Sequence, residues 1–214
     1  MAALLRALGL ACLAVAVPDP QSHGPTDYSA ELRDIQACAS SNVLSASVAL
    51  IPDGEVERTV VDRGVACLMK IVQGMAEGDE DDDEHEDRAA RITEIPLPKV
   101  DAESLRLIVQ FASGKVRTAG ADFQQLRFSE VPRPLSGPLS ETPSVLPEDV
   151  TFMDDVAADL DRLFRLTNAA NFVDCPALLD LCAARIAQMF IGKTPQQIRE
   201  AIPMSLLAPE DRDA

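Results

Sequence analysis

The chain has 214 residues, of which 35 are Asp or Glu and 19 are Lys or Arg, giving a formal net charge of −16 at pH 7. This charge, together with the lack of a basic cluster in the sequence, argues against binding to nucleic acid or to anionic membranes and favours a basic partner surface. The length allows one domain, or one domain with an appendage.

Residues 1–40 are expected to be disordered or to form a targeting segment. Arg6 precedes an apolar stretch from Ala7 to Val17 that ends in small residues, a pattern typical of a secretory signal peptide. This stretch is too short to span a bilayer, which needs about twenty residues. A presequence for an organelle and a translation start placed upstream of the true one are the alternatives.

A β-hairpin is predicted where two runs rich in β-branched residues, 47–51 and 55–61, follow each other. The tripeptide Pro52-Asp53-Gly54 separates them. Pro presets the turn and Gly accepts a positive φ, so this tripeptide suits the connection between two paired strands.

A helix is expected around 65–74, and an acidic loop follows at 77–91. Eight acids in nine positions of that loop repel one another, which favours a solvated segment. Its alternating acids are also typical of a calcium-binding EF-hand. However, the sixth position of that motif holds Glu84 instead of Gly, and the twelfth holds Ala90 instead of Glu. We therefore expect no metal site.

An extended segment and a longer helix are predicted next. In Ile95-Pro96-Leu97-Pro98 each Pro disfavours helix at the residue before it. Asp101 is expected to cap a helix that Gly114 ends. The apolar side of that helix carries Leu105, Ile108, Val109 and Ala112. Residues 117–149 are rich in Pro and are expected to form a loop or linker.

Two amphipathic helices are predicted in the region 150–214. The first runs over 158–172; Asp174 is expected to cap the second, with Pro176 just inside it and Gly192 ending it. The apolar stripe of the first helix comprises Leu160, Leu163, Phe164, Thr167 and Ala170. The stripe of the second comprises Leu178, Leu179, Cys182, Ile186 and Met189.

A third, short helix is predicted to start at Pro195. Thr194 and Gln197 have the spacing of a capping box, in which each side chain bonds to the other residue's amide. Ile198 and Ile202 lie on the apolar side of this helix.

Gly192-Lys193-Thr194 also matches the end of a phosphate-binding loop. That loop needs a Gly five positions earlier, where Ala187 stands inside a predicted helix, so no nucleotide site is expected.

The cysteines and histidines suggest neither a metal site nor a catalytic one. The five cysteines have no two-residue spacing typical of zinc or redox sites, and we expect buried, reduced thiols. They are Cys12, Cys38, Cys67, Cys175 and Cys182. His23 lies in a Pro-rich tail and His85 in the acidic run, so an ordered catalytic base is not apparent. We expect no enzyme activity and no cofactor.

Three segments near the C-terminus, 163–174, 178–182 and 191–199, occur in an order that resembles the C-terminal half of the Skp adaptor family. The turn at 53–55 and the stretch 95–100 resemble segments of the same family. The resemblance covers roughly Val43 to Lys115 and Thr151 to Pro209. It implies an α+β fold: a POZ/BTB-type domain at 43–116, with a small sheet and helices, followed at 150–214 by helices that bind the F-box.

The resemblance also implies two binding surfaces. The family's cullin-binding triplet corresponds to Ala170, Asn171 and Phe172, where Asn supplies a polar contact and Phe an apolar anchor. Phe172 could equally pack inside the core. The F-box surface corresponds to Leu178, Leu181, Ile186, Met189, Gly192, Lys193, Thr194, Pro195, Ile198 and Ile202.

One departure from the family concerns the C-terminus. The sequence ends shortly after Pro209, where family members continue into a Trp-containing tail that contacts the F-box, so some F-box affinity should be lost. Pro209 corresponds to a residue that is hydroxylated in some family members, although Ala208 replaces the Thr that precedes it.

The resemblance implies an adaptor subunit of an SCF-type E3 ubiquitin ligase that bridges a cullin and F-box proteins. A weak homodimer is compatible with it. The alternative is a divergent POZ-type or elongin C-like protein that works outside a cullin ligase. We expect a location in cytoplasm and nucleus, where thiols stay reduced. A secreted or organellar protein, cleaved near Val17 and oxidised at Cys175 or Cys182, is a third hypothesis.

Overall fold

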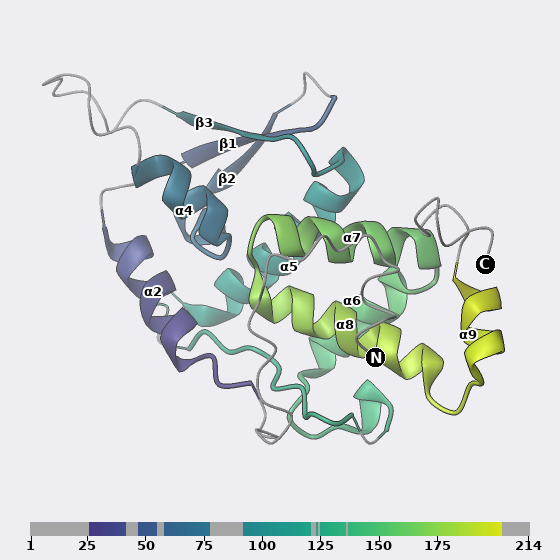
Figure 1. Ribbon diagram of the computed structural model, residues 1–214. Coiled ribbons are helices and arrows are strands. Elements are labelled where there is room, and N and C mark those ends of the chain that lie inside the picture. Colours follow the sequence, from purple (N-terminus) through teal and green to yellow (C-terminus); the bar gives the residue numbers. More distant parts are fainter. Residues whose placement is uncertain are drawn as a thin grey trace, which may run out of the picture.

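The computed structural model describes residues 26–41, 47–54, 58–77, 92–120, 123, 125–135 and 137–202. The fold is α+β, with a small sheet at one end of a helical body (Figure 1). The predictions for residues 1–25, for the acidic loop after Glu77 and for Pro209 lie outside the described residues. In the described ranges no helix is long and apolar enough to cross a membrane.

The predicted hairpin is confirmed. β1 (Ser47–Pro52) and β2 (Thr59–Asp62) pair antiparallel, with Leu50 opposite Thr59. Gly54 has a φ of 72°, the positive value for which a Gly is suited in the turn. The second strand begins later than predicted, at Thr59.

The extended segment before Lys99 is also confirmed. β3 (Thr93–Leu97) pairs parallel with β1, which makes β1 the central strand of the three-stranded sheet. Ile95 and Leu97 are buried, whereas Glu94 and Pro96 are exposed, so the strand alternates between core and solvent. Pro96 is tolerated because β3 is an edge strand of this sheet.

The single helix predicted around 65–74 is wrong. The structure has a short α3 (Arg63–Ala66) and a separate α4 (Lys70–Glu77). Five consecutive residues from Val65 to Met69 are buried. A continuous helix would turn some of these side chains toward solvent, so burial of the whole run requires a break between the helices.

The next helix is capped as predicted but is longer. The carboxylate of Asp101 accepts a hydrogen bond from the Ser104 amide at 3.0 Å, and α5 spans Ala102–Ala119. Gly114 therefore does not end it. A Gly inside a helix costs only about 1 kcal/mol, and continuation buries Ala119.

The Pro-rich region 117–149 packs on the core instead of acting as a spacer. It includes the last turn of α5, the 3-10 helix η2 (Leu139–Glu141) and the first turn of α6 (Pro147–Val156). Its buried apolar residues are Ala119, Leu126, Val131, Leu139 and Val145. The sheet half and the C-terminal half thus share one hydrophobic core.

The three C-terminal helices are confirmed as α7 (Leu160–Phe172), α8 (Pro176–Phe190) and α9 (Pro195–Ala201). Asp174 is not the cap of α8: it has a φ of 52°, and Cys175 occupies the N-cap position. The capping box of Thr194 and Gln197 is present as predicted.

The expectation of disorder up to residue 40 is wrong for the last part of that stretch. α2 (Ser29–Ser40) lies on the flank of the body beside α4 (Figure 1), with Tyr28 and Ile35 buried. The expectation of reduced thiols is wrong for Cys38 and Cys67, which form a disulfide. It is confirmed for Cys175 and Cys182, which are free and buried.

Candidate partner-binding surfaces

The end of α7 is fixed to the sheet half of the molecule through backbone hydrogen bonds. The amides of Lys70 and Ile71, at the start of α4, donate to the carbonyls of Asp174 and Val173, each at 3.3 Å. The first amides of a helix have no partner within the helix itself. The junction between α7 and α8 therefore satisfies two of the free donors of α4.

The structure places the three residues of the predicted cullin-binding triplet in different environments. Ala170 is fully buried, Phe172 is half-buried and Asn171 is exposed. The Ala170 carbonyl accepts from the Cys175 amide at 3.0 Å, which closes the turn into α8. Only Asn171 and Phe172 are therefore open to a partner.

Lys99 joins this surface, although it was not predicted. Its ammonium group lies 5.8 Å from the centroid of the Phe172 ring, within cation-π range. Phe172 also packs against the hydrophobic core. Lys99 belongs to the stretch 95–100, which resembles a segment of the family. This resemblance was the sequence feature that could have suggested Lys99 as a site residue. We refer to Lys99, Asn171 and Phe172 as the α7-end surface.

Arg165, about two turns before the end of α7, connects this helix to the start of α5. Its guanidinium contacts Glu103 at 2.8 Å, Asp161 at 2.9 Å and Asp101 at 3.2 Å. The hydrogen bond to Glu103 is the main cause of a raised pKa of Arg165. Burial raises the pKa of Asp101, but the hydrogen bonds from Ser104 and the charge of Arg165 together hold it below its usual value.

Two predicted F-box contacts, Leu178 and Leu181, lie inside the hydrophobic core. Leu178 is 0% and Leu181 is 1% exposed, because α8 packs against α6, α7 and η2. The packed 117–149 region supplies part of the core around α8. Leu178 and Leu181 can therefore support α8 but cannot contact a partner unless the core opens.

The other predicted F-box residues gather at the far end of α8. Ile186, Met189 and Ile198 are half-buried, and Ile202 is buried. The corner of Gly192, Lys193, Thr194 and Pro195 is exposed. Gly192 has a φ of 76°, which turns the chain sharply between α8 and α9. Figure 1 shows α9 set apart from the helical body at the end of α8.

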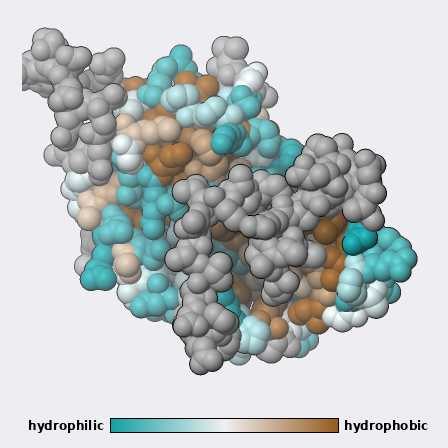
Figure 2. All heavy atoms as spheres, viewed as in Figure 1, coloured by the Kyte–Doolittle hydropathy of each residue, from teal (hydrophilic) through white to brown (hydrophobic). Residues whose placement is uncertain are grey.

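Apolar side chains remain accessible at this end. Ile191 is 55% exposed, although it is a large hydrophobic residue. In Figure 2 hydrophobic surface lies beside α9 on the visible face. Ile191 was not among the predicted contacts, even though its position next to Gly192 could have suggested it. We refer to Met189, Ile191, Ile198 and the corner 192–195 as the α8–α9 surface.

The free cysteines have the properties of core residues. Burial raises the pKa of the Cys175 thiol to about 11 and that of the Cys182 thiol to about 12. Thiolates are the nucleophilic and metal-binding form of cysteine. These two side chains are therefore protonated at neutral pH and act in packing.

Comparison with known proteins agrees with this architecture. The family model described as "Skp1 family, dimerisation domain" matches residues 176–203, which covers α8 and α9. An S-phase kinase-associated protein 1 homolog of Tetrahymena thermophila is 32% identical over 149 residues, covering 68% of this chain and 75% of the relative.

Two further relatives come from a plant and a fungus. SKP1-like protein 20 of Oryza sativa is 34% identical over 116 residues, covering 54% of this chain and 64% of the relative. The E3 ubiquitin ligase complex SCF subunit sconC of Talaromyces marneffei is 25% identical over 165 residues, covering 75% of this chain and 84% of the relative. The Tetrahymena relative, at 32% identity over 75% of its length, is similar enough to establish the family of this chain. The chain belongs to the Skp1 family, with a BTB/POZ-like fold followed by C-terminal helices.

Proposed function

We propose that this chain is a non-catalytic adaptor of an SCF-type E3 ubiquitin ligase. It joins the N-terminal domain of a cullin to F-box substrate receptors in ubiquitin-dependent protein degradation. Membership of the Skp1 family supports this proposal, as does the similarity to sconC, which is named as a subunit of an SCF complex.

The observation that carries the proposal is the separation of the two candidate surfaces along α8. The α7-end surface lies just before the start of this helix, and the α8–α9 surface lies at its end. α8 has 15 residues, which at 1.5 Å per residue corresponds to about 22 Å. Two protein partners can therefore bind at the same time without competing for the same side chains.

The cullin is assigned to the α7-end surface. Asn171 offers an exposed amide, and Phe172 offers an aromatic ring that the core and Lys99 hold in place. A fixed aromatic ring beside polar groups is the usual composition of an interface hot spot. The F-box receptor is assigned to the α8–α9 surface, where exposed apolar residues suit a partner helix.

A location in cytoplasm and nucleus follows from this role and remains part of the proposal. The Cys38–Cys67 disulfide is unusual for a reducing compartment, where disulfides tend to be transient and redox-sensing. A signal peptide at 1–17 would instead bring the chain to an oxidising compartment. The N-terminal residue of the protein isolated from its own cells distinguishes these locations.

Size-exclusion chromatography with light scattering tests the proposed function. The full chain, a cullin N-terminal domain and an F-box domain are mixed in equal amounts, and each pair is run as a control. A complex with the mass of all three supports the adaptor role. Elution with the F-box domain alone would contradict it and favour a role outside cullin ligases. The mass of the chain alone shows whether it forms a homodimer.

A further inference from the structure

α2 is attached to the molecule at both of its ends. Before its first residue, the Tyr28 hydroxyl donates to the Asp180 carboxylate of α8 at 2.7 Å. The Tyr28 ring packs edge-on against Phe128, with centroids 5.4 Å apart. Near its last residue, the disulfide between Cys38 and Cys67 joins α2 to the turn between α3 and α4.

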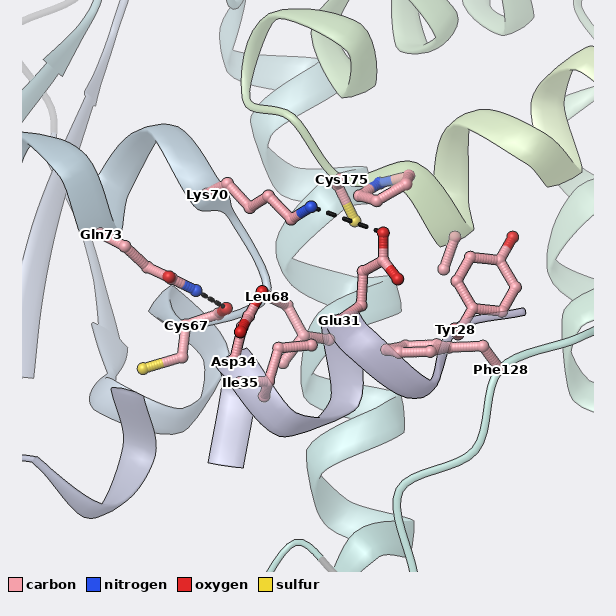
Figure 3. Close-up of a pocket in the computed structure, with 12 residues that line it drawn as sticks. Tyr28, Glu31, Asp34, Ile35, Cys67, Leu68, Lys70, Gln73, Phe128 and Cys175 are labelled. Atoms are coloured by element: carbon pink, nitrogen blue, oxygen red, sulfur yellow. Dashed lines mark hydrogen bonds and ion pairs between the residues drawn. The ribbon is translucent and has the colours of Figure 1, made fainter. Parts of the chain in front are cut away.

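Between these attachments α2 covers a small apolar pocket (Figure 3). Ile35 from α2 and Leu68 from the α3–α4 turn line it, as does Cys175 from the start of α8. Glu31 of α2 reaches Lys70 at the rim, with 3.4 Å between the charged groups. The middle of the helix is held by the buried Ile35, by the partly buried Leu32, which packs on the core, and by this partly exposed ion pair.

We propose that the Cys38–Cys67 disulfide makes α2 a redox-sensitive strap. In the oxidised chain both ends are fixed and α2 lies over the pocket. In the reduced chain the C-terminal part of α2, residues 36–41, detaches, while Tyr28 keeps the other end on α8. A helix of 12 residues is marginal in water without external contacts. Besides the disulfide, the last turns have a hydrogen bond from the Gln36 side chain to the Phe123 carbonyl at 3.2 Å, one from the Arg63 guanidinium to the Ser41 carbonyl, and packing of the partly buried Ala39. Each such hydrogen bond contributes only about 1–2 kcal/mol, whereas the disulfide is a covalent attachment of these turns.

The two sulfurs differ in their access to a reductant. Cys67 is fully buried, whereas Cys38 is half-buried at the edge of the molecule. A thiolate of a small dithiol is therefore expected to attack Cys38, breaking the S–S bond and releasing Cys67, which takes up a proton. The second thiol of the reductant then closes its own disulfide and releases Cys38. The chain gains two thiols and the dithiol is oxidised to a cyclic disulfide.

The free cysteine at the pocket does not interfere with this switch. Cys175 lines the same pocket as Cys67. Burial raises the pKa of Cys175 to about 11, so its thiolate is scarce at neutral pH and exchange with the disulfide is slow. Reduction and oxidation are therefore confined to the pair Cys38 and Cys67 within the described residues.

Amide hydrogen exchange with mass spectrometry tests the strap on the full chain without any partner. The oxidised chain is prepared in a glutathione redox buffer, and peptide mapping locates the disulfide. The chain is then measured before and after treatment with dithiothreitol, with the mass gain confirming reduction. We expect amides in 36–41 to exchange at least about tenfold faster after reduction, while rates in α7 and α8 stay unchanged.

Two variants define the result. In Cys38→Ser the fast exchange of 36–41 should be present before dithiothreitol and should not change on its addition. Tyr28→Phe should instead speed exchange in the first turn of α2 in both redox states. The proposal is overturned if the chain with both thiols shown to be reduced keeps the exchange rates of the oxidised form. It is also overturned if the redox buffer fails to join Cys38 to Cys67.

Discussion

The ammonium group of Lys99 lies 5.8 Å from the centroid of the Phe172 ring. This contact joins the residue that follows β3 by two positions to the last residue of α7. Phe172 also packs on the hydrophobic core and is half-buried. The packed part of the ring agrees with a core aromatic, and the accessible part leaves surface for a partner, so the binding role of Phe172 stays a prediction.

Replacing Phe172 by Ala should weaken both binding and folding. Loss of an aromatic anchor is expected to reduce cullin affinity by about 2 kcal/mol, or roughly 30-fold. The lost core contacts should lower the free energy of unfolding by about 1–2 kcal/mol. Titration calorimetry and urea unfolding measure the two effects. Phe172→Leu is the control, because it keeps apolar packing while removing the ring; unchanged cullin affinity in both variants would remove Phe172 from the interface.

Replacing Thr194 by Ala should loosen α9 and reduce F-box binding. The Thr194 hydroxyl accepts from the Gln197 amide, and loss of such a cap costs about 1 kcal/mol. We expect roughly fivefold weaker F-box binding and faster amide exchange in 195–201, with little change in global unfolding. Thr194→Ser should restore both. Faster exchange with unchanged F-box affinity would show that α9 lies outside the F-box interface.

The buried pair of Lys115 and Asp149 should be essential for stability. Their charged groups are 2.7 Å apart, and each side chain is 3% exposed. The Ser129 hydroxyl donates to the same carboxylate at 2.6 Å. Asp149→Asn leaves a buried ammonium without a counter-charge and should cost about 3 kcal/mol or more in urea unfolding.

A matched variant on the same helix tests whether removal of any paired carboxylate from α6 lowers the stability as much. Asp154 of α6 pairs with Arg185, but its side chain is 60% exposed. Asp154→Asn should therefore cost less than about 1 kcal/mol. Similar losses in the two variants would mean that the Lys115–Asp149 pair has no special role.

Stability should fall in acid partly through Asp101. Its pKa in the folded chain lies below the usual 3.8, because hydrogen bonds from Ser104 and the charge of Arg165 outweigh burial. A lowered folded pKa gives stability that is present above pH 3.8 and is lost as the pH falls through the folded value. Since Asp101 is partly exposed, the contribution is about 0.5 kcal/mol.

Asp101→Asn isolates this contribution, because Asn retains the helix cap without the charge. Urea unfolding between pH 6 and about 2.5 should show a smaller loss of stability in the variant than in the original chain. Equal losses in the two proteins would indicate that the Asp101 carboxylate has no part in the acid response.

Features set by local chemistry could be predicted from the sequence. The turn at Gly54, the cap at Asp101 and the capping box at Thr194 each depend on residues within four positions of one another. The family resemblance predicts one candidate surface at the end of α7 and the other toward the end of α8. Their contacts with partners stay predictions.

Features set by distant contacts could not be predicted. α2 is held by Asp180, which is 152 positions from Tyr28, and five cysteines allow ten pairings, of which periodicity selects none. Leu178 and Leu181 were assigned to an open surface because the packing of η2 and α6 on α8 was not apparent. The helix break after Ala66 likewise follows from burial on several sides.

Titration calorimetry with two partners tests the central claim most directly. A cullin N-terminal domain is titrated into the full chain, first alone and then with the chain saturated by an F-box domain. Separate surfaces about 22 Å apart, as estimated from the length of α8, predict one-to-one cullin binding with similar affinity in both titrations. Loss of cullin binding in the F-box-saturated chain, or its absence in both titrations, would contradict the adaptor role.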